Sequence, residues 1–151
     1  MVKLSSLKFL SGQMQKDAKV LFHSGRYVGS VYLMGYALEF AFKKKISLTL
    51  GFNSGFPDTR NDYSLYANIV STFITKSTGI QLSSLHDIRN HNLSKLLTYS
   101  GVESRIVRNY YSEWLVVKRW KPEDRYRVQR LGRNRSKEFL DAAFIILKQI
   151  L

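Results

Sequence analysis

The stretch "YVGSVYLMGYALEFAFKKK", residues 27–45, carries two periodic patterns on one segment. Apolar residues recur three or four positions apart, which is typical of a helix that buries one face; they are Val28, Val31, Met34, Leu38, Ala41 and Phe42. A second stripe follows steps of four, three and four, through Tyr32, Tyr36, Glu39 and Lys43. The stretch therefore predicts a core helix with a second, polar and aromatic side.

Two interpretations of this second side are open. Tyrosines at helical spacing are commonly half-buried packing residues, whereas a row of polar groups is also one wall of a binding site. Gly29 and Gly35 weaken the helix by about 1 kcal/mol each relative to alanine. Glycines kept inside a helix often mark the close approach of another element or a ligand.

The rest of the chain extends the helical pattern. We expect further helices at residues 5–23, 62–76, 93–100, from 102 or 103 to 120, and 134–150, with the quoted helix running from 26 to about 47. Gly25 is expected to end the first helix, and Pro122 to set a turn. No alternating strand pattern and no repeat occurs. We therefore predict one all-α domain over residues 1–151, an up-and-down bundle of four to five helices.

Composition narrows the possible functions. The chain has 151 residues and no cysteine, which excludes disulfides and thiolate metal sites. Its longest apolar stretch, residues 31–42, is shorter than the roughly 20 residues of a membrane span and contains Glu39. With three histidines and no cysteine, no metal site and no cofactor are predicted. We expect a cytoplasmic protein without a signal peptide or membrane contact.

The net charge of +13 favours polyanionic partners. Residues 105–137 hold eleven Lys or Arg and three acids, a balance of +8. Within them we identify a basic tract as a candidate nucleic-acid surface: Arg127, Arg130, Arg133, Arg135 and Lys137. The alternative is an ordinary solvated basic face.

Glu39 is the lone acid in an otherwise apolar and aromatic helix, and a buried carboxylate is costly unless paired. An ion pair with Lys43 or with Arg125 would satisfy it. We predict a direct contact between Glu39 and Arg125. Such an acid can also hold a basic residue that faces a ligand.

His91, Arg125 and Tyr126 complete the candidate ligand site with Tyr32, Tyr36, Glu39 and Lys43. An imidazole can bind phosphate or transfer protons near neutral pH, although a histidine near a helix start is often only a neighbour of the cap. Arginine matches phosphate bidentately, and tyrosine stacks on bases. We place the site between the helix at 26–47 and the turn at 120–126.

Three segments taken in order resemble the HEPN family, the higher eukaryotes and prokaryotes nucleotide-binding domains, in their stand-alone prokaryotic form. They are "SGRYVGSVYLMGYALEFAFKKKI", "LHDIRNHNLSKLLTYSG" and "WKPEDRYR". The resemblance implies a helical bundle, often a homodimer, that works beside RNA or nucleotides. Many members are ribonucleases or toxins, and some pair with a nucleotidyltransferase that acts as antitoxin.

One family motif is missing from this sequence. Ribonuclease members use "R-x(4–6)-H", and no arginine lies five to seven residues before His23, His86 or His91. We therefore favour a nucleotide- or RNA-binding domain of a toxin–antitoxin or defence-type system that is not itself an enzyme. The alternatives are a ribonuclease toxin with a non-standard pair, His91 and Arg125, and an interaction module for a nucleotidyltransferase-type partner.

Overall fold

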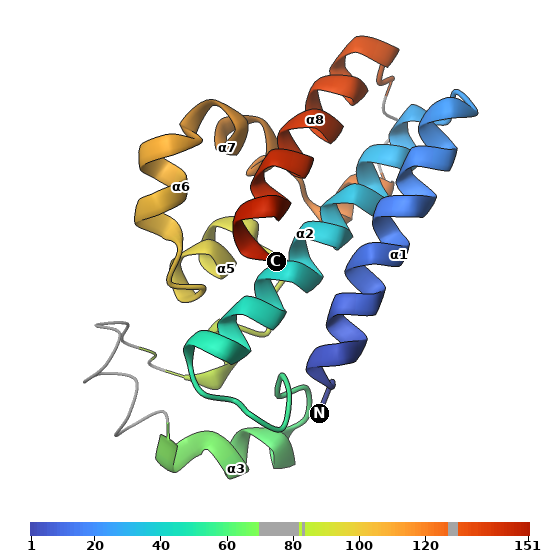
Figure 1. The fold of residues 1–151 in the computed structure, drawn as a ribbon. Coiled ribbons are helices and arrows are strands. Elements are labelled where there is room, and N and C mark those ends of the chain that lie inside the picture. Colours follow the sequence, from blue (N-terminus) through green and yellow to red (C-terminus); the bar gives the residue numbers. More distant parts are fainter. Residues whose placement is uncertain (70–81, 83, 127–129) are drawn as a thin grey trace.

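The computed structural model describes residues 1–69, 82, 84–126 and 130–151. Helices α1 (Leu4–His23) and α2 (Tyr27–Thr49) form an antiparallel hairpin (Figure 1). Gly25 joins them at a φ of +73°, a conformation that L side chains rarely adopt. The expected end of the first helix at Gly25 is confirmed.

Helix α2 is the central helix of the bundle. It packs against α1 on one side and against α8 (Arg133–Ile150) on another, and Figure 1 shows α8 lying along it. The apolar stripe of α2 is fully buried at Met34, Leu38, Ala41 and Phe42. Burial of that stripe, rather than helix propensity, holds a segment that contains two internal glycines.

Three short helices cover the side of the bundle formed by α2 and α8. They are α5 (Leu93–Tyr99), α6 (Glu103–Asn109) and α7 (Tyr111–Val117). We predicted one helix from 102 or 103 to 120, and that prediction is wrong. Tyr110 interrupts it at φ −138° and ψ 36°, which turns the chain so that Ile106 and Trp114 are both buried.

The remaining elements are α3 (Arg60–Ile69) and two short 3-10 helices, η2 (Leu85–Asp87) and η3 (Pro122–Tyr126). Helix α3 begins two residues before its predicted start at 62, and residues 70–76 of that predicted helix lie outside the described residues. The predicted turn at Pro122 is the start of η3.

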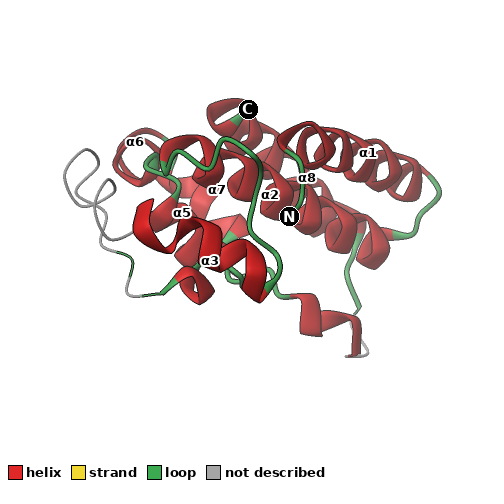
Figure 2. Ribbon diagram, turned by 90° about the horizontal axis from the view of Figure 1, so that it is seen from below, coloured by secondary structure: helices red, strands yellow, loops and turns green. Residues whose placement is uncertain are grey.

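The fold is all-α, as predicted. The described residues contain seven α-helices and no strand, more helices than the four to five expected (Figure 2). The break at Tyr110 divides one of the six expected ranges into two helices, which gives seven. Across the described part of the chain, no helix combines the length and apolarity needed to cross a bilayer.

A candidate anion-binding site around His91

Glu39 is the buried centre of the site, with only 1% of the residue exposed. One carboxylate oxygen accepts a hydrogen bond from Lys43 Nζ at 2.6 Å, one turn further along α2. The other accepts from His91 Nδ1 at 2.8 Å, just before α5. Both oxygens are therefore satisfied, and the two donors come from different parts of the chain.

The contact with Glu39 fixes the tautomer of His91. A carboxylate can only accept, so the Nδ1–H of His91 must donate. In the neutral ring, Nε2 then carries a lone pair. The His91 side chain is 54% exposed although its partner is buried. His91 is thus a solvent-accessible imidazole held from behind by a buried acid.

The predicted contact between Glu39 and Arg125 is wrong. Lys43 and His91 occupy the two oxygens of Glu39. Arg125 Nη1 instead donates to the Tyr32 hydroxyl at 3.3 Å, and Nη2 donates to the Tyr126 hydroxyl. The physical reason is position: η3 brings Arg125 to Tyr32, which precedes Glu39 on α2 by nearly two turns.

The tyrosine stripe of α2 links Arg125 to the neighbourhood of His91. The Tyr32 hydroxyl donates to the Tyr36 hydroxyl at 3.2 Å, and the Tyr36 ring lies edge-on to His91 with ring centroids 6.3 Å apart. Burial, and then the contact with Tyr32, raise the pKa of the Tyr36 hydroxyl above its ordinary value, so this phenol stays neutral at physiological pH.

Trp120 packs against α2 at Gly35. A Cβ built on Gly35 would lie 2.0 Å from Cε2 of the indole, a separation that no packed side chain tolerates. The same ring lies edge-on to Tyr36 with ring centroids 5.1 Å apart. This is the close approach that the glycines of the quoted stretch predict, and it holds the start of η3 beside His91.

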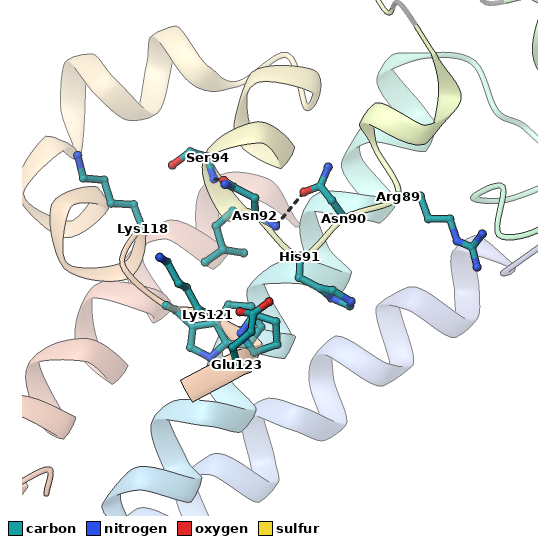
Figure 3. A pocket seen from close by; sticks show the side chains of 11 residues that line it. Arg89, Asn90, His91, Asn92, Ser94, Lys118, Lys121 and Glu123 are labelled. Atoms are coloured by element: carbon teal, nitrogen blue, oxygen red, sulfur yellow. Dashed lines mark hydrogen bonds between the residues drawn. The ribbon is translucent and has the colours of Figure 1, made fainter. Parts of the chain in front are cut away.

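A cavity of about 660 Å³ opens at His91 (Figure 3). Its walls come from the segment before α5, the start of α5 and the segment around Trp120; the polar lining residues are Arg89, Asn90, His91, Asn92, Ser94, Lys118, Lys121 and Glu123. In Figure 3, Arg89 points away from the other labelled residues, and its Nε lies 3.7 Å from Asp58 Oδ1. Lys118, Lys121 and His91 are the other basic residues of the lining; in Figure 3 the two lysine side chains extend to one side of the cavity and the His91 ring to the other.

Sequence reasoning missed Lys118 and Lys121. They belong to the +8 segment, but nothing in the sequence separates them from other exposed lysines there. The sequence feature that could have identified them is their position on either side of Trp120, which opens the segment "WKPEDRYR". The structure joins that motif to the one containing His91.

The candidate ligand residues do not share one cavity. His91 lines the cavity described above, whereas Tyr32 and Arg125 line a smaller hollow on which Trp120 also borders. Tyr126 is 76% exposed, and its ring lies 4.5 Å below the Arg125 guanidinium. Lys43 pairs with Glu39 and approaches the Phe56 ring, so it supports the site from inside.

The basic tract lies apart from the His91 cavity. Arg130, Arg133 and Arg135 line a separate hollow of about 300 Å³ at the start of α8. Lys137 instead pairs with Asp141 at 2.5 Å across one helical turn. Arg127 lies outside the described residues. The tract is therefore at most a second basic surface.

No group of three or more His, Asp or Glu side chains in the described ranges is arranged to hold a metal ion. No protein-family model matches the chain, and no curated protein or solved structure matches it either. The HEPN resemblance therefore stays a hypothesis, and the evidence on function is the geometry around His91.

Proposed function

We propose that this protein binds a phosphate-bearing ligand, a nucleotide or RNA, in the cavity at His91. Lys118 and Lys121 offer ammonium groups, His91 an imidazole, and Asn90, Asn92 and Ser94 neutral polar groups. Among the described residues, Glu123 is the one acid that lines this cavity. A lining of this kind attracts an anion and can hydrogen-bond its oxygens.

The observation that carries the proposal is the contact between His91 and Glu39. An exposed surface histidine needs no buried carboxylate, and burying one is costly without good partners. Here the acid is 1% exposed and orients an imidazole that lines a cavity with lysines. Such support is expected where a side chain must hold its position for a ligand.

Binding measurements on charge variants test the proposal. We expect nucleoside monophosphates or a short single-stranded RNA to raise the melting temperature, and the Lys118→Gln/Lys121→Gln variant to bind at least about tenfold more weakly. A hydrogen bond to a charged group contributes about 1.5–3 kcal/mol, and 1.4 kcal/mol is tenfold in affinity.

Arg119→Gln is the matched control for these variants. Arg119 lies between the two lysines in sequence and is exposed, but it does not line the cavity. Its loss should leave affinity nearly unchanged. Comparing mononucleotides with the RNA separates the two kinds of ligand. No binding of either ligand at low salt rejects the proposal.

The same contact favours a second candidate function, metal-independent cleavage of RNA. His91 Nε2 would take the proton of a ribose 2′-hydroxyl while that oxygen attacks the adjacent phosphorus. The bond from phosphorus to the 5′-oxygen breaks, and the departing oxygen regains a proton from the imidazolium or from water. Arg125, the other sequence candidate, lines a different hollow, so the lysines would stabilise the charge on phosphorus.

Cleavage of a labelled RNA in the presence of a chelator separates binding from catalysis. Products with a 2′,3′-cyclic phosphate that disappear in His91→Ala support the second candidate. Intact RNA that binds to wild type leaves binding alone as the function.

A further inference from the structure

A second hollow, of about 220 Å³, lies beside the cavity at His91. Residues of α2 form one wall, and Trp120, two residues of η3 and Leu131 form the other; the lining residues are Val28, Gly29, Val31, Tyr32, Trp120, Asp124, Arg125 and Leu131. Binding sites for drug-sized ligands measure about 300–1,000 Å³. This hollow therefore fits one ring system rather than a whole nucleotide.

The walls of the hollow suit an aromatic ring. Val28, Val31 and Leu131 supply aliphatic surface, and Tyr32 and Trp120 supply aromatic surface. Gly29 adds no side chain to its part of the wall, and a Cβ built there would crowd Leu21 Cδ1 of α1 at 3.2 Å. Base–aromatic stacking is favourable for every base, because every base has a π-face.

Among the described lining residues, the polar side chains come from η3 and from Tyr32. Arg125 is held there by its hydrogen bond to the Tyr32 hydroxyl at 3.3 Å, and Asp124 is its neighbour. A guanidinium is a fork of donors that matches the acceptor pairs on base edges. The hollow thus combines apolar walls with polar groups, as a nucleobase requires.

Trp120 connects this hollow with the lysine-lined cavity, because it lines both. Helix η3 does the same, with Pro122 and Glu123 at the larger cavity and Asp124 and Arg125 at the smaller hollow. A ligand with an anionic end and an aromatic end would fill the two together.

We propose that the 220 Å³ hollow is a nucleobase subsite, and that a nucleotide unit binds with its base beside Tyr32 and Trp120 and its phosphate at His91, Lys118 and Lys121. This inference rests on the proposed function, and it makes the ligand a nucleotide unit rather than any phosphate ester.

A comparison of two ligands tests the subsite. Ribose 5-phosphate carries the phosphate without a base, and the four nucleoside 5′-monophosphates add one. We expect titration calorimetry to give at least about tenfold tighter binding for the best monophosphate than for ribose 5-phosphate, from stacking of the base. Equal affinities would overturn the subsite while leaving the phosphate site in place.

Val31→Trp fills the hollow, and Val20→Trp is its control. Val31 is half-buried and lines the hollow, whereas Val20 is 64% exposed on α1 and does not. Val31→Trp should abolish the preference for the monophosphate and keep the affinity for ribose 5-phosphate; Val20→Trp should change neither. An unchanged preference in Val31→Trp overturns the subsite. No binding of any of these ligands to wild type rejects the subsite, and it rejects the proposed function as well if the short RNA also fails to bind.

Discussion

At the scale of single residues, Glu39 gives the sharpest predictions, because its charge is buried and its partners are known. Lys43 and His91 compensate it from two elements, whereas Arg125 bonds to tyrosines. Residues in contact couple by about 0.5–3 kcal/mol in a double-mutant cycle, and residues without shared partners add within about 0.5 kcal/mol. The structure therefore specifies which pairs couple.

We predict strong coupling between Glu39→Gln and Lys43→Met and near-additivity between Glu39→Gln and Arg125→Met. Removing one partner of a buried ion pair costs up to about 3–5 kcal/mol, because the other charge stays buried. Urea denaturation of each single and double variant measures both cycles. Coupling above about 1 kcal/mol with Arg125 would contradict the contacts described here.

Gly35 gives a second prediction at this scale. Gly35→Ala should destabilise the protein by about 1–3 kcal/mol, since the added methyl overlaps the Trp120 ring and overpacking outweighs the gain in helix propensity. Gly12→Ala is the matched control, because Gly12 is also helical and has nothing within 4 Å of its built Cβ. It should stabilise by up to about 1 kcal/mol. Thermal unfolding distinguishes the two; equal signs would refute the packing argument.

At the scale of elements, the start of α3 depends on one carboxylate. Asp62 accepts hydrogen bonds from the backbone N–H groups of Asp58 and Thr59, while Thr59 Oγ1 accepts from the N–H of Asp62. This reciprocal arrangement is a capping box. The amino group of Met1, 2.6 Å away, and then these N–H groups hold the pKa of Asp62 well below its ordinary range.

We predict a pH-dependent effect of Asp62→Asn. A carboxyl group whose pKa is lowered by folding stabilises the protein above its unfolded pKa of about 3.9, and this contribution is lost as pH falls towards the folded value. The variant should therefore melt below wild type at pH 7, and the difference should shrink as pH falls below about 4. Melting curves from pH 2 to 7 measure it. Asp141→Asn, which removes an exposed pair on α8, is the control and should have a small effect.

The helices also show which parts of the fold could be predicted from the sequence. The periodicity of α1, α2 and α8 predicted them to within about three residues at each end, because each buries a long apolar stripe. The break at Tyr110 was missed because apolar residues continue on both sides of it, and the contact of Trp114 with Phe42 that follows the turn is not encoded locally. The expected pairing of Glu39 with Lys43 is confirmed, but its contact with His91 was missed for a related reason. His91 is 52 positions away, and no local pattern encodes that contact.

At the scale of the whole molecule, the net charge of +13 is divided between distinct surfaces. Lys118 and Lys121 face the His91 cavity, and Arg130, Arg133 and Arg135 face another hollow. A long anion would meet both, whereas a mononucleotide would need only the first. The dependence of affinity on salt counts the phosphates involved.

We predict that single-stranded RNA binds with a slope of log affinity against log salt near about −3, as expected if about four phosphates are neutralised. Replacing Arg130, Arg133 and Arg135 with alanine should flatten the slope by about two units. Fluorescence anisotropy over a range of salt concentrations measures it. Replacing Lys8, Lys16 and Lys19, exposed on α1, removes the same charge elsewhere and should leave the slope nearly unchanged. Equal slopes in the two triple variants would make the tract an ordinary solvated face.

The place of Trp120 has an optical consequence. The protein has two tryptophans. Trp114 is buried against Phe42 and lines none of the cavities described above, whereas Trp120 lines both the His91 cavity and the neighbouring hollow. The indole N–H of Trp120 is buried and has no hydrogen-bond partner among the described residues. The fluorescence emission of Trp120 should therefore lie at short wavelength. Trp114→Phe would leave Trp120 as the one tryptophan, and quenching of its fluorescence would report occupancy on either side of it without any added dye.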